Sequence, residues 1–228
     1  MEIPRYIRNH KAISEADQSA LREKCVLVAG CGGLGGYVIE SLGRLGVGHL
    51  VVVDGDIFDE TNLNRQLLSS NMNLGKPKVL AAQQRMQAVN PLVKVDAHQV
   101  MLTELNAPAL MQGCDLVVDA LDNIPSRIIL IKTARQTGIP LVHGAIAGWS
   151  GQVYIVQPGD ERMELLYGNA TSEKGAEVEL GNLAFTASLV ASIQAAEAVK
   201  LLLGVGKSIE GLLQIDLLHG LVDEINLT

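Results

Sequence analysis

A glycine-rich segment with the spacing Gly-x-Gly-x-x-Gly, formed by Gly30, Gly32 and Gly35, is the first feature that could do chemistry. It follows a short apolar run, Cys25–Ala29, and precedes a segment of helical length. Glycines allow a sharp turn and a close approach of backbone to phosphate, whose charge is favoured at a helix N-terminus. Asp54 ends the next apolar run, 19 positions after Gly35, where a carboxylate can accept hydrogen bonds from ribose hydroxyls. These residues predict a nucleotide site, although a tight turn without a ligand shares the pattern.

Two cations that follow Asp54 favour a polyphosphate over a nicotinamide ring. Arg65 and Lys78 are thirteen residues apart, within the polar segments 62–66 and 75–78. Arginine can bind two phosphate oxygens at once and lysine adds a point charge, whereas hydride transfer requires neither. The pair therefore favours ATP over NAD, with solvated surface cations as the alternative reading.

A second carboxylate is expected at the same edge of the sheet. Asp122 and Asn123 follow the apolar run Leu116–Ala120. Because the carboxyl ends of parallel strands face one crevice, Asp122 can hold Mg²⁺ through one or two oxygens while water and phosphate supply the rest. Either residue could instead cap the helix that Pro125 opens.

Alternating strands and helices must position these groups. Short apolar runs without alternation are typical of strands covered on both faces. The chain predicts an α/β, Rossmann-like, mostly parallel sheet flanked by helices, with antiparallel strands added in the C-terminal part. The expected strands are 25–29, 49–54, 93–97, 116–120, 140–145, 151–156, 211–216 and 221–227, and the expected helices are 14–24, 34–45, 76–89, 103–112, 125–137 and 183–203.

We expect one domain over 1–228. Its parts are an N-terminal arm and helix (1–24), a nucleotide-binding core (25–156), a mobile crossover loop (157–182), and a helix with a hairpin (183–228). The crossover loop is polar, contains glycine and has the length at which a structureless segment is usually functional.

Composition narrows the class of protein. With a formal net charge of −7 and 3% aromatic residues, the chain lacks the electrostatic attraction and stacking surface that nucleic acids require. Its three cysteines form no Cys-x-x-Cys pair, so neither a disulfide framework nor a zinc site is expected. The charged start predicts no signal peptide, and charged residues interrupt the apolar stretch 183–204, which favours a buried helix over a membrane span. We expect a cytoplasmic protein with no membrane partner.

Seven segments give the chain a specific resemblance. Together they resemble the ThiF/MoeB/HesA family, the bacterial branch of the ubiquitin-activating-enzyme superfamily, continuously from Arg5 to about Val156 and more weakly beyond. The segments are Arg5–Arg8, Gly30–Gly35, Asp54–Asp56, Asn62–Gln66, Gly75–Lys78, Asn90–Pro91 and Asp119–Asn123.

The resemblance implies ATP- and Mg²⁺-dependent adenylation of the C-terminal glycine carboxylate of a small ubiquitin-like carrier protein. It implies catalytic roles for Arg65, Lys78 and Asp122, with Asp122 at the magnesium ion, and for Arg8 reaching the triphosphate from the partner subunit of a homodimer. The implied nucleotide-binding residues are Gly30, Gly32, Gly33, Leu34, Gly35, Asp54, Asp56, Asn62, Arg65, Gln66, Lys78, Asp122 and Asn123.

Cysteine placement departs from many members of that family. They carry two zinc-binding Cys-x-x-Cys pairs or a crossover-loop cysteine, whereas this chain has no cysteine after Cys114. Cys25, Cys31 and Cys114 are expected to be packed small residues, so a separate sulfur donor is implied. His143 is expected to be a hydrogen-bonded residue near a strand end, not a catalytic base.

The crossover loop has a further candidate use. Its acidic residues suit a carrier with basic residues near its tail, and the loop could order over that tail; a solvated loop is the alternative. The residues concerned are Glu161, Glu164, Glu173, Glu177 and Glu179.

Three other functions compete. They are adenylation of a carboxylate on a modified tRNA base, a silent partner subunit that binds no ATP, and an NAD-dependent oxidoreductase. The net negative charge argues against a tRNA substrate. The presence together of four residues with implied roles at ATP argues against a silent subunit; they are Arg8, Arg65, Lys78 and Asp122.

Overall fold

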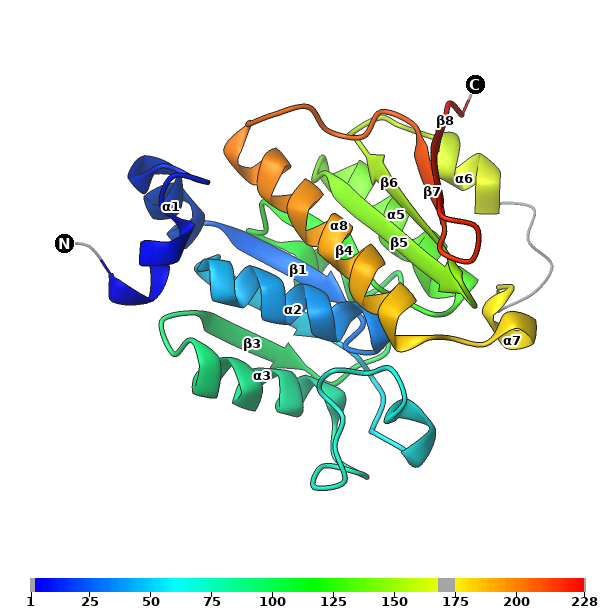
Figure 1. Cartoon of the computed structure of the whole chain (residues 1–228), viewed down its shortest axis with the longest axis horizontal. Coiled ribbons are helices and arrows are strands. Elements are labelled where there is room, and N and C mark those ends of the chain that lie inside the picture. Colours follow the sequence, from blue (N-terminus) through cyan, green and yellow to red (C-terminus); the bar gives the residue numbers. More distant parts are fainter. Residues whose placement is uncertain (1–2, 168–174, 228) are drawn as a thin grey trace.

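A mixed eight-stranded sheet organises the protein, with the strand order β3-β2-β1-β4-β5-β6-β7-β8 (Figure 1). The computed structural model describes residues 3–167 and 175–227. Strands β1 to β5 are parallel, and β6, β7 and β8 add antiparallel partners. The predicted fold class is confirmed. The strands are β1 (Cys25–Ala29), β2 (His49–Val53), β3 (Lys94–His98), β4 (Leu116–Asp119), β5 (Leu141–Ala147), β6 (Ser150–Val156), β7 (Leu212–Asp216) and β8 (Leu221–Ile225).

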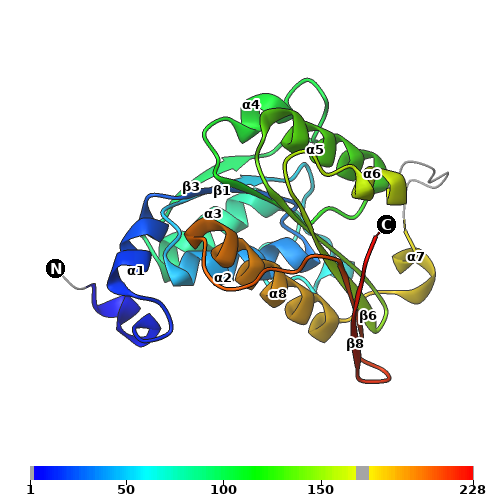
Figure 2. The same cartoon turned by 90° about the horizontal axis from the view of Figure 1, so that it is seen from above.

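Helices cover both faces of this sheet, as buried apolar strands require. Figure 2 shows α4, α5 and α6 on one side and α2, α3 and α8 on the other. Alternate residues of β1 enter the two cores: Val26 and Val28 pack toward α2, and Leu27 and Ala29 toward α5. The helices are α1 (Glu15–Arg22), α2 (Gly33–Leu45), α3 (Lys78–Val89), α4 (Ala107–Met111), α5 (Ile124–Thr137), α6 (Arg162–Tyr167), α7 (Glu177–Leu180) and α8 (Ala184–Leu203), with short 3-10 turns at Pro4–Asn9 and Glu60–Asn62.

The segment 157–182, expected to be irregular, contains α6 and α7. Asp160 begins α6 by accepting a hydrogen bond from the backbone N–H of Arg162 at 2.9 Å, and Met163 is fully buried in the core. Each helix is too short to produce an apolar periodicity, so neither could be predicted from the residue pattern. Part of the segment, including Glu173, lies outside the described residues, and its mobility stays a prediction.

Helix α8 is long and apolar enough to cross a membrane by length and composition. In the structure it packs along α2 and against β5 and β6 (Figure 1). Its buried residues include Thr186, Gln194 and Glu197, and Gln194 donates to the backbone oxygen of Asp119 at 2.8 Å. These contacts place α8 within the core of the domain.

Candidate active site

A cleft of about 800 Å³ opens at the carboxyl ends of the parallel strands. It lies where β1 is flanked by β2 and β4, the point at which the strand order reverses. Open α/β sheets bind ligands at this switch point because loops from neighbouring strands diverge there. Most of the sequence-predicted nucleotide residues line it: Gly30, Gly32, Gly33, Leu34, Asp54, Asp56, Arg65, Gln66, Lys78, Asp122 and Asn123.

Close backbone packing explains two of the glycines. Gly30 has φ +96°, and a Cβ there would lie 2.5 Å from the backbone oxygen of Ala120. A Cβ on Gly35, which does not line the cleft, would lie 1.8 Å from the backbone oxygen of Gly30. Helix α2 begins after Gly32 without a side-chain cap, so the N–H groups of its first turn are available to an anion.

The carboxylate of Asp54 is fixed toward the cleft by backbone N–H groups. Oδ2 accepts from Cys31 at 2.7 Å and Oδ1 accepts from Asp56 at 2.8 Å. Burial raises the pKa of Asp54, although Lys78 and these two hydrogen bonds act in the opposite direction. Each oxygen keeps a lone pair, which suits it to accept from two neighbouring hydroxyls.

Lys78 is a buried cation in the wall of the cleft. It opens α3, is 6% exposed, and its Nζ lies 2.9 Å from Oδ2 of the exposed Asp56. Arg65 is partly exposed, and its Nη1 donates at 2.9 Å to both the Thr61 oxygen and Asn64 Oδ1. The expected pair of cations therefore faces one cleft.

Two other predicted nucleotide-binding residues, Asn62 and Gln66, lie in the segment that carries Arg65, and Gln66 is the one that lines the cleft. The Gln66 side chain lies against the glycine loop, and its buried Oε1 has no hydrogen-bond partner among the residues that the structure describes. Asn62 is buried behind the cleft, where its Oδ1 accepts from the Asp59 N–H at 3.2 Å. The structure places Asn62 as support for the loop that carries Arg65.

The choice between Asp122 and Asn123 as helix cap is decided by geometry. Asn123 Oδ1 accepts from the backbone N–H of Ser126 at 2.9 Å, so it is the N-cap of α5. Asp122 is exposed and lines the cleft. In the described part of the chain no three His, Cys, Asp or Glu side chains cluster as a metal site. A single carboxylate suits Mg²⁺ that takes its other ligands from phosphate and water.

Arg8 does not reach the cleft of its own chain. It is exposed on the 3-10 turn Pro4–Asn9, beyond the amino ends of the parallel strands (Figure 1). This turn is anchored by the buried Tyr6, whose hydroxyl accepts from Asn90 at 2.8 Å, and by Arg5, which donates to Asn90 Oδ1 at 2.6 Å. A role for Arg8 at a nucleotide requires a second chain.

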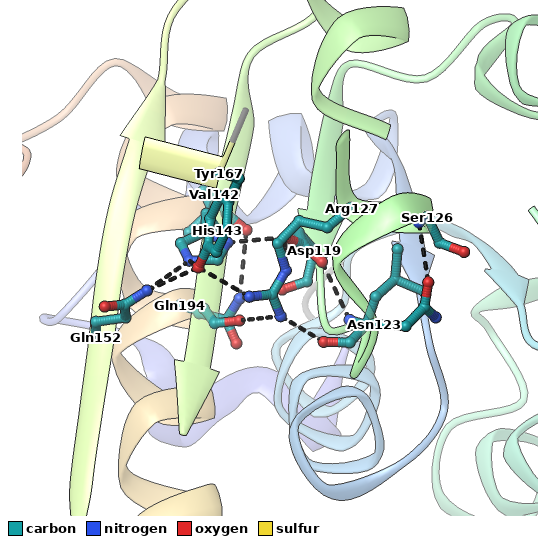
Figure 3. A network of polar contacts seen from close by, with 11 residues as sticks. Asp119, Asn123, Ser126, Arg127, Val142, His143, Gln152, Tyr167 and Gln194 are labelled. Atoms are coloured by element: carbon teal, nitrogen blue, oxygen red, sulfur yellow. Dashed lines mark hydrogen bonds and ion pairs between the residues drawn. The ribbon is translucent and has the colours of Figure 1, made fainter. Parts of the chain in front are cut away.

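A buried polar network under the cleft was not predicted (Figure 3). Asp119, at the end of β4, is fully buried and accepts from His143 Nδ1 at 2.8 Å. Arg127 Nε lies 3.1 Å from the same carboxylate oxygen, but its N–H is not aimed at that oxygen, so the contact is an ion pair. The Tyr167 hydroxyl accepts from Arg127 at 2.9 Å and from Gln152 at 2.8 Å, and lies 3.2 Å from His143 Nε2.

Charge compensation explains how this network stays ionised at Asp119 and Arg127. Burial raises the pKa of Asp119, but Arg127 and His143 more than offset it, so the pKa lies below its ordinary value. Burial and the Arg127 charge lower the pKa of His143, which favours a neutral imidazole that donates to Asp119. His143 is hydrogen-bonded, as expected, and the expectation that it is not a catalytic base stays a prediction. Through Gln152, Tyr167 and Arg127, which line the cleft, the network supports its floor.

Exposed apolar side chains lie near the cleft. Trp149, which precedes the cleft-lining Ser150, meets Phe185 in a tilted ring pair with centroids 4.8 Å apart, and the two residues are 44% and 45% exposed. Val178 on α7 is 67% exposed and lines the cleft. Acidic residues also line the cleft, namely Glu177, Asp216 and Asp223.

A family model described as the ThiF family matches residues 5–228. The chain belongs to the ThiF family. A sulfur carrier protein adenylyltransferase of Thermus thermophilus is 39% identical, over 92% of this chain and 81% of that protein. A SAMP-activating enzyme E1 of Haloferax volcanii is 36% identical, over 92% and 79%. The molybdopterin-synthase adenylyltransferase of Escherichia coli is 34% identical, over 85% and 79%.

Solved structures confirm the fold of this ThiF-family chain. Escherichia coli MccB with ATP has a TM-score of 0.81 at 20% identity, over 99% of this chain and 72% of that one. The Escherichia coli tRNA N6-threonylcarbamoyladenosine dehydratase with ATP has a TM-score of 0.76 at 21% identity, over 88% and 94%. Since the sequence relatives from Thermus and Escherichia are adenylyltransferases, this chain is an enzyme of that class, and the oxidoreductase alternative is set aside.

Proposed function

We propose that the protein uses ATP and Mg²⁺ to adenylate the C-terminal glycine carboxylate of a small ubiquitin-like sulfur-carrier protein, releasing pyrophosphate. The observation that carries the proposal is one cleft that combines the glycine loop with Arg65, Lys78 and Asp122. The names of the sequence relatives from Thermus and Haloferax support the choice of substrate class.

The cleft supplies each function that carboxylate adenylation needs. Asp54 binds the ribose, and the uncapped start of α2 binds phosphate oxygens. Arg65 and Lys78 neutralise the charge that develops when the carboxylate attacks the α-phosphate and pyrophosphate leaves. Before ATP binds, the ion pair with Asp56 holds the buried Lys78 side chain in place. When ATP binds, Lys78 exchanges this ion pair for a phosphate oxygen.

Asp122 holds the magnesium ion beside the triphosphate. Bound there, Mg²⁺ supplies charge neutralisation to phosphate oxygens. Asp122 is suited to this role because Asn123 performs the helix capping, which leaves the neighbouring carboxylate in the cleft.

The carrier's extended tail enters between α7 and the sheet in this proposal. Val178 and Gln152 line that side of the cleft, and the Trp149–Phe185 pair offers an apolar docking surface beside it. Acidic Glu177 favours a carrier with basic residues near its tail.

The reaction stops at the adenylate, and a separate sulfur donor completes the transfer. None of the three cysteines lines the cleft; Cys31 is fully buried, and burial together with the Asp54 charge raises the pKa of its thiol. A thiol in that state is a poor nucleophile. We place this activity in the cytoplasm, whose reducing conditions suit three free cysteines.

A homodimer completes each site through Arg8. The test mixes Arg8→Ala and Asp122→Ala proteins, each inactive alone, under conditions where subunits exchange. A mixed dimer has one site with both residues intact, so activity returns. No recovery in confirmed heterodimers refutes the role of Arg8 across the interface.

The triphosphate role of Arg65 is tested by detecting the carrier–AMP adduct by mass spectrometry. Arg65→Ala abolishes the adduct while circular dichroism stays unchanged, whereas Arg44→Ala, a change on the exposed surface of α2, keeps it. A wild-type rate of adduct formation in Arg65→Ala would show that this arginine does not act on the triphosphate.

A further inference from the structure

Two cysteines, a histidine and an aspartate meet at the amino ends of the strands, at the opposite end of the sheet from the nucleotide cleft. Cys25 begins β1, His49 begins β2 directly beside it, and Asp96 follows in β3. Cys114 lies just before β4. The next residue, Asp115, donates its backbone N–H to the backbone oxygen of Cys25 at 2.8 Å. The parallel register therefore brings side chains from four segments together.

The distances connect these groups in a chain. The sulfurs of Cys25 and Cys114 are 3.6 Å apart, and Cys25 Sγ lies 3.4 Å from His49 Nδ1. His49 Nε2 lies 2.8 Å from Asp96 Oδ2, which also accepts from Lys94 at 2.7 Å. A thiol beside an imidazole that a carboxylate orients is the arrangement that activates a cysteine nucleophile.

The two thiols differ in surroundings. Cys25 is partly exposed, whereas Cys114 is 8% exposed. The hydrogen bond from the Cys114 thiol lowers the pKa of Cys25 against the opposing effect of burial. The same hydrogen bond, together with burial, raises the pKa of Cys114. Cys25 packs against the core, as expected from the sequence, but unlike Cys114 its side chain is partly exposed.

We propose that Cys25 and Cys114 form a redox-active dithiol that reacts with low-molecular-weight disulfides, with Cys25 as the attacking thiol and Cys114 as the resolving thiol. The Cys25 thiolate attacks one sulfur of the disulfide, forming a mixed disulfide and expelling one thiolate. Cys114 then loses its proton, attacks Cys25 Sγ and expels the second thiolate. Two protein thiols are oxidised to one disulfide while the small disulfide is reduced to two thiols.

The geometry suits the second step. The sulfurs must approach by about 1.5 Å to reach the bonded separation of about 2.05 Å. His49 accepts the proton of Cys25 or stabilises its thiolate, and Asp96 orients the ring. The product would tie the start of β1 to the connection between α4 and β4, away from the cleft.

The test treats full-length reduced protein with oxidised glutathione and follows the products by mass spectrometry with peptide mapping. Wild-type protein forms an intramolecular Cys25–Cys114 disulfide, and the Cys31→Ser control behaves identically. Cys114→Ser accumulates a glutathione adduct at Cys25, and Cys25→Ser forms neither product. Equal reactivity of all four proteins, or adducts that never resolve in wild type, overturns the proposal.

His49→Asn separates activation from simple exposure of the thiol. Each unit rise in the Cys25 pKa lowers the rate of adduct formation at neutral pH by about threefold, because the loss of thiolate is partly offset by higher nucleophilicity. The rate difference between wild type and His49→Asn should shrink as the pH approaches the range where the Cys25 thiol is ionised in both proteins. A pH-independent difference would assign His49 a purely structural role and remove it from the proposed site.

Discussion

Asp119→Asn is the substitution that most sharply tests the buried network. Asn fills the same volume but removes the negative charge, leaving the Arg127 guanidinium at 6% exposure without a counter-ion. Removing one partner of a buried pair costs about 3–5 kcal/mol, because the remaining charge stays desolvated. At about 2–4 °C per kcal/mol for a chain of this size, the Tm should fall by about 6–20 °C.

Urea and thermal unfolding measure this effect, with Asp115→Asn as the matched control. Asp115 is 36% exposed and pairs with Lys24 at 3.2 Å, so its loss should cost at most about 1 kcal/mol. In Asp119→Asn/Arg127→Met both charges are gone, and the double variant should be more stable than the sum of the single losses predicts. A loss below about 1 kcal/mol in Asp119→Asn, or additive losses in the double variant, would refute the network as a coupled ion pair.

The same variant has a defined pH signature. The pKa of Asp119 is lowered in the folded protein, so its stabilising contribution is present above the unfolded pKa and is lost as the pH falls through the folded value. The stability difference between wild type and Asp119→Asn should therefore be constant above about pH 5 and shrink below about pH 4. A difference that stays constant into acid would contradict the ionised state of Asp119.

Three further predictions concern the cleft and its rim. Lys78→Met should raise the KM for ATP or lower kcat by about 10- to 150-fold, the equivalent of one lost charged hydrogen bond, while the exposed Lys76→Met changes neither in the same kinetic assay. Gly35→Ala should lower the Tm measured by calorimetry, because its Cβ would lie 1.8 Å from the backbone oxygen of Gly30. The control Gly33→Ala should have a smaller effect, because the nearest atom to its Cβ is 3.8 Å away. Equal stability of both variants would contradict the close packing of strand and helix. Trp149→Ala should weaken carrier binding by about 30-fold in titration calorimetry without changing ATP affinity, and unchanged carrier affinity would remove Trp149 from the docking surface.

Local sequence signals predicted the parts of the site that depend on neighbours in the chain. The glycine loop and Asp54 belong to one strand–turn–helix–strand unit, so spacing alone places them, whereas spacing left both Asp122 and Asn123 as candidates for the cap of α5. The residue types of Arg65 and Lys78 already favoured a phosphate chain, and the family resemblance then implied their catalytic roles.

Contacts between distant segments could not be predicted in this way. Asp119 and His143 are 24 positions apart, Arg127 and Tyr167 are 40 apart, and Cys25 and Cys114 are 89 apart. Considered alone, each residue is an ordinary helix, strand or core residue. The register of the sheet brings Asp119 to His143 and Cys25 near Cys114, and the packing of α5 against α6 brings Arg127 to Tyr167. The place of Arg8 depends on a second chain, which no pattern within one chain defines.

The decisive experiment for carrier adenylation is ATP–pyrophosphate exchange with Mg²⁺, using purified small proteins that end in Gly-Gly, one at a time. Exchange should depend on one carrier and should disappear when the terminal glycine of that carrier is deleted or when Arg65→Ala protein is used. ATP binding without exchange for every carrier would contradict carrier adenylation, and would direct attention to a carboxylate that is not part of a protein.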